Sequence, residues 1–257
     1  MVEYTCMKGE GLHVSIAPYH IGELWGLPIT PTLLTTSFVA VLLVTAAFFI
    51  GRNIKIVPGK GQVAVEGVLY GVYGYVLSVL EDEKLAKRFF PLIVTIFLYI
   101  AIANLFGLLP FVGSIGVHGG TGHGGFTPLF YPPSSDLNFP LALAFVAFLA
   151  IEFAGIAALG FLKYAHKFVN FSSVIGFVVG IIELISEVAR LVTFSFRLFG
   201  NIFAGKVLLL VALYFIPFLL PVPLVLYETL VGIIQGAIFA LLTLFFIKIA
   251  ATPHEAH

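Results

Sequence analysis

The sequence predicts an all-α polytopic membrane protein. Hydrophobic residues make up 60% of its 257 positions and charged residues only 10%, and the mean hydropathy is +1.10. This composition is typical of a chain whose surface faces lipid. No segment is long and polar enough for a soluble catalytic domain, and no phosphate-binding loop or hydrolase motif occurs. We therefore expect a single transmembrane domain over residues 1–257, not catalytic on its own and without a cofactor.

Charge, cysteine and histidine content narrow the class further. The formal net charge is zero, and no basic block suggests nucleic acid. One cysteine allows no internal disulfide. The N-terminus lacks a cleavable-signal pattern, so the first apolar segment is expected to stay in the membrane. Histidines in glycine-rich or terminal positions are expected to bind water rather than a metal; they are His118, His123, His254 and His257.

Five apolar segments are expected to cross the bilayer as helices, since about 20 residues span the hydrocarbon. Thr30 and Pro31 suit the cap and first residue of the first helix. The expected order is an outer N-terminal segment 1–32, a first span 33–50, an interfacial and cytoplasmic segment 61–88, a second span 89–110, an outer loop 112–138, a third span 139–161 and a helical hairpin 174–250. The first arm of the hairpin, 174–215, is twice the required length, so we expect it to be tilted or broken.

Residues 61–80 are only mildly apolar. Glu66, Gly67, Gly71 and Gly74 interrupt the apolar run. We expect an amphipathic helix there that lies at the membrane interface.

The distribution of Lys and Arg predicts the orientation. Residues 52–88 contain six of them and residues 163–167 two, whereas 112–138 and 216–223 contain none. The positive-inside rule then places 52–88 and 163–173 in the cytoplasm. Five crossings put the N-terminus outside and the C-terminus in the cytoplasm.

A polar stripe runs along the first arm of the hairpin. At 100° per residue, its members fall within about 80° of one another on a helix; they are Glu183, Glu187, Arg190, Phe194, Arg197 and Asn201. Glu183, Glu187 and Arg190 can neutralise one another internally, which is a structural alternative to a channel role. Arg197 lies about 15 Å along the helix from Glu187. An arginine at a helix centre costs roughly 2.5 to 3.5 kcal/mol, so we expect its partner on another helix or subunit.

Four segments in this chain resemble characteristic segments of one family, subunit a of F-type ATP synthases. Residues 197–205 (RLFGNIFAG) resemble its signature. Residues 104–110 (NLFGLLP), 133–138 (PSSDLN) and 235–243 (QGAIFALLT) resemble further segments, in the same order.

The resemblance implies an ion-translocating stator of a rotary motor. Such a subunit packs against a ring of c subunits, and two aqueous half-channels lead ions to and from the ring carboxylates. Arg197 would face these carboxylates, and the peripheral-stalk b subunits would be further partners. The translocated ion would be a proton, with sodium as the alternative. A bacterial plasma membrane is the expected location, with an organellar inner membrane as the alternative.

The resemblance also implies roles for other polar residues. Gln235 would orient Arg197; its structural alternative is a polar bridge between two packed helices. The outer half-channel would contain Asn201, Glu228, Lys206, Asn104, Ser134, Asp136 and Asn138. The cytoplasmic half-channel would contain Glu183 and Glu187. Helix capping is the alternative, or an additional role, for Asp136 and Asn138.

Two positions depart from the family pattern. Many bacterial members carry a glutamate at the position of Lys206 and a histidine at that of Glu228. A Lys206–Glu228 ion pair would keep the path polar, and a lysine that snorkels outward is the alternative. Some members carry an aspartate at the position of Gly107.

Two other functions fit a membrane protein with buried charges. A self-contained secondary ion transporter would show repeated halves with broken helices, and no such repeat is visible in the sequence. A membrane scaffold would explain the small residues at close spacing but not Arg197.

Overall fold

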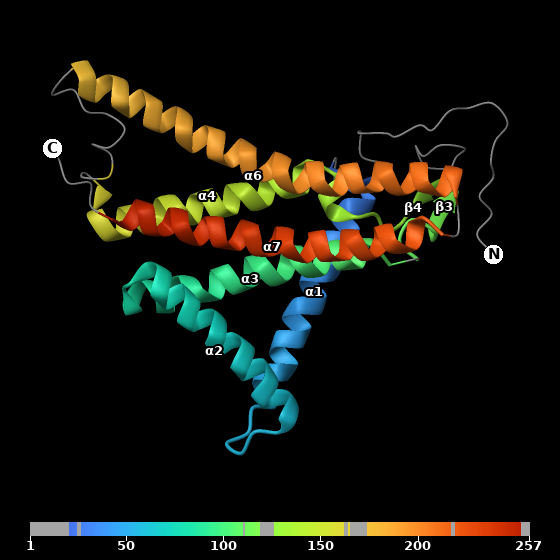
Figure 1. Ribbon diagram of the computed structural model, residues 1–257, viewed down its shortest axis with the longest axis horizontal. Helices are drawn as coiled ribbons and strands as arrows, with labels where there is room; N and C mark the ends of the chain where they lie inside the picture. The colour runs from blue at the N-terminus through green and yellow to red at the C-terminus, as the bar shows by residue number, and fades with distance from the viewer. Residues whose placement is uncertain are drawn as a thin grey trace. The chain divides into compact units, whose positions relative to one another are not determined.

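Long helices dominate the structure, a computed structural model, and confirm the all-α membrane class. It describes residues 21–24, 27–109, 111–118, 126–161, 164, 174–216 and 219–252. The long helices are α1 (Pro31–Arg52), α2 (Lys60–Leu80), α3 (Glu83–Gly107), α4 (Asn138–Leu159), α6 (Val174–Phe215) and α7 (Pro221–Ala251) (Figure 1). His123, His254 and His257 lie outside the described residues.

Short antiparallel strands occur in the two segments predicted to be outside. β1 (Gly22–Leu24) pairs with β2 (Leu27–Ile29), and β3 (Gly116–His118) pairs with β4 (Phe126–Pro128). A 3₁₀ turn over Pro133–Ser135 leads into α4.

Six helices in the described ranges are long and apolar enough to cross a membrane, one more than the five expected. The additional one is α2, which the sequence analysis placed within an interfacial segment 61–88. The structure ends α2 at Leu80 and starts α3 at Glu83, so the helix expected at 89–110 begins earlier. With 21 residues, α2 has the length that a bilayer crossing requires. The number of crossings, and with it the orientation of the termini, stays a prediction.

Local capping explains where the helices begin and end. The Thr30 hydroxyl accepts a hydrogen bond from the Leu33 N–H (3.2 Å), which confirms the predicted start of α1. Asp82 accepts the N–H groups of Lys84 (2.7 Å) and Leu85 (3.2 Å) at the start of α3. α4 ends at Leu159, and the next residue, Gly160, has a φ of +84°, which favours glycine after a helix C-terminus.

The helix α6 is continuous over 42 residues (Figure 1). At 1.5 Å per residue it is about 63 Å long, twice the hydrocarbon thickness of about 30 Å. Of the two expected forms, tilted or broken, the structure therefore excludes a break. An unbroken helix of this length must tilt strongly or extend beyond the bilayer.

The chain divides into two compact units. Unit 1 takes the residues up to Thr45 together with Tyr99–Pro140 and Arg197–Gln235. Unit 2 takes Ala46–Leu98, Leu141–Phe196 and the residues from Gly236 onward. Each unit has its own buried apolar side chains: Val39, Ile100 and Leu198 are buried in unit 1, and Ile151, Phe239 and Leu244 in unit 2.

Close backbone packing in unit 1 explains the glycine at position 107, where some relatives carry aspartate. A Cβ on Gly107 would lie 2.8 Å from the Cβ of Pro132 and 3.1 Å from its Cα. These atoms belong to a rigid proline ring and its backbone, so they cannot move aside as a flexible side chain would. Aspartate at position 107 therefore requires a shift of the loop before α4.

We expect Gly107→Ala to destabilise the protein by about 1 to 3 kcal/mol, because overpacking forces the backbone to move. Gly74→Ala is the matched control, since a Cβ there meets no atom within 4 Å. Alanine is the better helix former by about 1 kcal/mol, so this control should be neutral or stabilising. Thermal unfolding of the purified chain in detergent measures both. Equal midpoints for the two variants would contradict the packing argument.

Candidate functional site

Arg197 lies on an exposed face of α6. Within the described part of the chain its guanidinium has no hydrogen bond or ion pair. The neighbouring apolar side chain Phe196 is also exposed, at 55%. The face of α6 around Arg197 therefore presents an unpaired cation to whatever lies outside this chain.

Gln235 joins α7 to α6 in unit 1. Its Oε1 accepts a hydrogen bond from the Asn201 side chain at 2.9 Å, and Gln235 is only 2% exposed. Its amide Nε2 is buried without a hydrogen-bond partner in the described structure. The structure thus shows the polar bridge between packed helices that the sequence analysis named as the alternative. The orientation of Arg197 by Gln235 stays a prediction.

Asn104 connects three segments of unit 1. Its amide donates to the Gly232 carbonyl of α7 (3.2 Å), and its oxygen accepts from the Ser134 hydroxyl (2.6 Å). Asn104 and Ser134 are both buried. A Cβ on Gly232 would lie 3.0 Å from the Cβ of Asn104, so glycine lets α3 and α7 approach closely enough for this contact.

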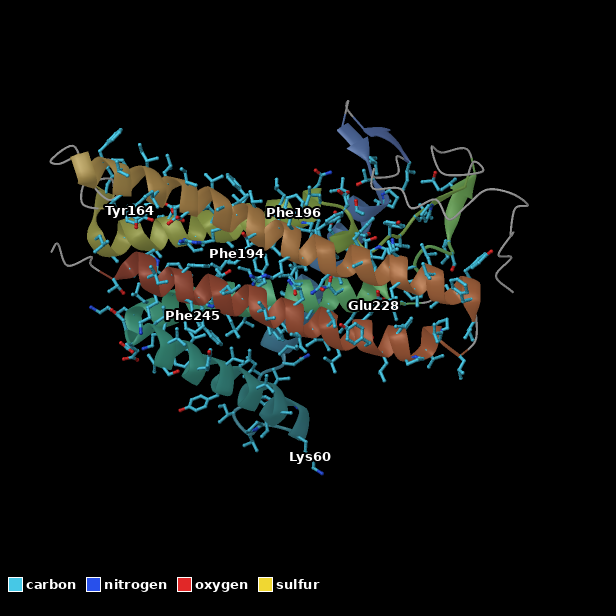
Figure 2. All side chains as sticks on the ribbon, turned by 45° about the horizontal axis from the view of Figure 1, so that its top comes forward. Lys60, Tyr164, Phe194, Phe196, Glu228 and Phe245 are labelled. Atoms are coloured by element: carbon cyan, nitrogen blue, oxygen red, sulfur yellow. The ribbon has the colours of Figure 1, made fainter. Side chains whose placement is uncertain are left out.

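Glu228 is nearly buried, at 9% exposure, on α7 (Figure 2). Its carboxylate packs against Gly205 of α6, where a Cβ would overlap the Oε1 atom. A small residue on α6 thus leaves the space that the Glu228 carboxyl group occupies.

Asp136 caps α4 and also contacts α1. One carboxylate oxygen accepts the Asn138 N–H (3.1 Å), and the other accepts the Thr32 hydroxyl (2.8 Å). The capping role is thus confirmed for Asp136. The side chain of Asn138 is exposed at the start of α4, so it is not enclosed with the buried polar groups.

Lys206 adopts neither of the two expected arrangements. Its Nζ lies over the Tyr131 ring, 3.1 Å from the centroid, and 3.5 Å from the Ser135 hydroxyl. Within the described residues it forms no ion pair with Glu228, and it does not snorkel outward. Lys206 therefore points into unit 1, where an aromatic face and a hydroxyl stabilise the ammonium. Tyr131, Ser135 and Thr32 were not predicted from the sequence, since single aromatic and hydroxyl side chains carry no distinctive spacing. Tyr131 and Ser135 precede α4, and Thr32 lies in the first turn of α1.

Glu187 and Arg190 form the internal pair that was the structural alternative for the stripe. The atoms Nη1 of Arg190 and Oε2 of Glu187 are 2.7 Å apart, and the Arg190 guanidinium stacks 3.8 Å from the Phe246 ring centroid. Glu187 is 3% exposed. Glu183 is half-buried one helical turn earlier.

Two titratable residues of unit 2 were not singled out in the sequence. Glu152 is the only charged residue of α4, and Tyr164 is 4% exposed. The isolated charge in an apolar span was a usable signal for Glu152. Tyr164 carried no such signal in the sequence, because it is notable only for the contact of its ring with Gly155 of α4.

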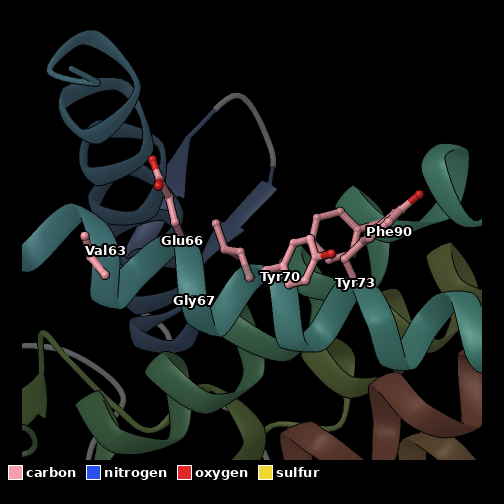
Figure 3. A pocket seen from close by; sticks show the side chains of 7 residues that line it. Val63, Glu66, Gly67, Tyr70, Tyr73 and Phe90 are labelled. Atoms are coloured by element: carbon pink, nitrogen blue, oxygen red, sulfur yellow. The ribbon is translucent and has the colours of Figure 1, made fainter. Parts of the chain in front are cut away.

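A concave surface in unit 2 is lined mainly by residues of α2. A groove of about 640 Å³ is lined by Glu66, Tyr70, Tyr73 and Phe90 among others (Figure 3). Gln62 donates a hydrogen bond to Glu66 at its rim (2.7 Å). Within the described residues no group of three or more His, Cys, Asp or Glu side chains could hold a metal ion.

Comparisons with known proteins show the family to which the chain belongs. Residues 33–248 match the family described as ATP synthase A chain. ATP synthase subunit a of Campylobacter jejuni strain 81-176 is 30% identical over 219 residues, covering 85% of this chain and 89% of the relative. The same-named protein of Campylobacter concisus is 32% identical over 84% and 88% of the two chains, and that of Mycobacterium marinum is 32% identical over 95% and 96%. The chain therefore belongs to the ATP synthase subunit a family.

Proposed function

We propose that the protein is the ion-translocating stator subunit of a rotary F-type ATP synthase. Arg197 faces the carboxylates of a c-ring, and two half-channels carry protons to and from that ring. The chain is a membrane subunit of the complex, and ATP turnover belongs to another sector. The observation that carries the proposal is the exposed, unpaired guanidinium of Arg197 in a helix long enough to span a membrane.

The charge of Arg197 is better explained by carboxylates that move past it on the c-ring than by a fixed carboxylate within the chain. Opposite charges 4 Å apart attract by about 4 kcal/mol at an effective dielectric constant of 20. Arg197 thereby favours the deprotonated form of each carboxylate that passes it. A fixed partner within the chain would cancel this charge, as Glu187 does for Arg190. The same positive charge keeps protons from leaking directly between the half-channels.

The outer half-channel is formed by the polar groups of unit 1. Ser134, Asn104 and the Gly232 carbonyl make a continuous hydrogen-bonded line, and Glu228 supplies a carboxyl group that can take up and release a proton. Lys206 and Asp136 contribute further polar surface, whereas Asn138 marks the exposed entrance. The hydrogen bond between Asn201 and Gln235 links α6 to α7. Asn201 lies one helical turn after Arg197 on α6.

The cytoplasmic half-channel is formed by Glu183 and Glu187 of α6. Glu187 combines its ion pair to Arg190 with a proposed channel role, as a carboxylate that can exchange a proton. The proposed setting is a bacterial plasma membrane with the N-terminus outside and the C-terminus in the cytoplasm. The b subunits of a peripheral stalk hold the chain in place.

Purification from native membranes tests the assembly. We expect the chain to copurify with a ring of small two-helix subunits and with stalk subunits. A homo-oligomer without such a ring would instead support a self-contained transporter. Subunit composition by gel electrophoresis and mass spectrometry is the measurement.

Arg197→Ala is expected to abolish coupled proton transport while the complex still assembles. Loss of about 4 kcal/mol of attraction corresponds to roughly a thousandfold loss of rate. ATP-driven acidification of inverted vesicles measures it. Arg52→Ala, which removes an exposed arginine at the end of α1, is the matched control and should pump normally. Normal pumping by Arg197→Ala would refute the assigned role.

Glu228→Gln is expected to slow proton delivery by about 100-fold, since it removes a group that can exchange protons. Glu228→Asp keeps the carboxyl group and should retain part of the rate. Passive proton conductance of vesicles stripped of the ATP-hydrolysing sector is the readout. Glu83→Gln changes an exposed glutamate of α3 and serves as the control. If Glu228→Gln conducts at the control rate, Glu228 lies outside the path.

A further inference from the structure

Unit 2 contains titratable groups that the proposed half-channels do not include. One is Glu152, the only charged residue in the 22 residues of α4. A charged carboxylate in an apolar helix is energetically costly. Such residues are usually retained for a function or by a partner.

Tyr164 folds back onto the same face of α4. Its ring packs so closely against Gly155 that a Cβ on this glycine would overlap the ring. Residues three apart share one face of a helix, so Glu152 lies one turn from the site of this contact. Figure 2 shows Tyr164 beside α4. The buried phenol thus lies next to the carboxyl group of Glu152.

The electrostatics of Tyr164 agree with this geometry. Burial first, and then the neighbouring Glu152, raise the pKa of Tyr164 well above its ordinary value. Glu187 of α6 adds to this rise, and Arg190 opposes it. The phenol therefore lies within electrostatic reach of two carboxylates from different helices. It stays protonated and is available as a hydrogen-bond donor.

A phenol that lies next to one carboxyl group and within electrostatic reach of another can pass a proton without becoming a phenolate. Its oxygen accepts the proton of a protonated Glu152 while its own O–H bond breaks and that proton moves to the Glu187 carboxylate. Glu152 is left deprotonated, Glu187 protonated and the phenol intact. The reverse order of events carries a proton the other way. No oxidant or further reactant is required.

We propose that Glu152 and Tyr164 form a proton relay between the cytoplasmic surface and Glu187. The relay rests on the proposed function and extends its cytoplasmic half-channel to α4. Tyr164 belongs to the segment 163–173 that the charge distribution assigns to the cytoplasm. Glu187 is held in place by Arg190, which is itself stacked on Phe246 of α7. These contacts hold the Glu187 carboxylate, the proton acceptor of the relay, in place.

The test uses the assembled membrane sector in inverted vesicles from which the ATP-hydrolysing sector has been stripped. Glu152→Gln and Tyr164→Phe should each lower passive proton conductance by about tenfold or more, because each removes an exchangeable proton from the relay. The double variant should conduct no less than the slower single variant, since both residues serve one step. Glu152→Asp should recover most of the rate. Matched controls are Glu66→Gln on α2 and Tyr214→Phe, whose side chain is 68% exposed.

Two results would overturn the relay. One is wild-type conductance by Tyr164→Phe in an assembled complex, a variant that keeps the ring on Gly155 and removes only the hydroxyl. The other is a double variant whose loss is the product of the single losses. If Glu152→Gln does not assemble, Tyr164→Phe and Glu152→Asp decide the question. Failure of the relay is distinct from failure of the proposed function, since Arg197→Ala would then still block transport.

Discussion

The unfavourable free energy of a charge in an apolar helix governs the polar chemistry of this chain. Three cations on α6 meet this constraint in different ways. Arg190 pairs with Glu187 at 2.7 Å and stacks on Phe246. Lys206 lies over Tyr131, 3.1 Å from the ring centroid. Arg197 is exposed and, in the described structure, has no partner. Two of these cations thus have stabilising partners within the chain, whereas the third has none that the structure describes.

Small residues make the polar contacts between helices possible. Gly232 lets Asn104 reach the backbone of α7, and Gly205 leaves room for the Glu228 carboxyl group. Gly155 has the same effect for the Tyr164 ring in unit 2. Since lipid gives little hydrophobic drive for helix association, such close packing and the hydrogen bonds it allows hold the helices together. The glycines therefore position the polar side chains of the proposed half-channels as well as the helices.

The polar groups fall into two sets that match the proposed half-channels. Asn104, Ser134, Lys206 and Glu228 belong to unit 1, and Glu152, Tyr164 and Glu187 to unit 2. The continuous helix α6 contributes to both sets.

The sequence by itself determined the membrane class, the main helices and the family, because hydropathy, helix caps such as Thr30 and short motifs are local properties of the chain. It also identified Arg197 through the energetic anomaly of a charge among apolar residues. Only the tertiary structure decided that Lys206 turns toward Tyr131, that Gln235 bonds to Asn201 and that Tyr164 folds back onto Gly155. These outcomes depend on which residues from distant segments come together. A periodicity along one helix places a side chain on a face but does not specify its partner across the interface.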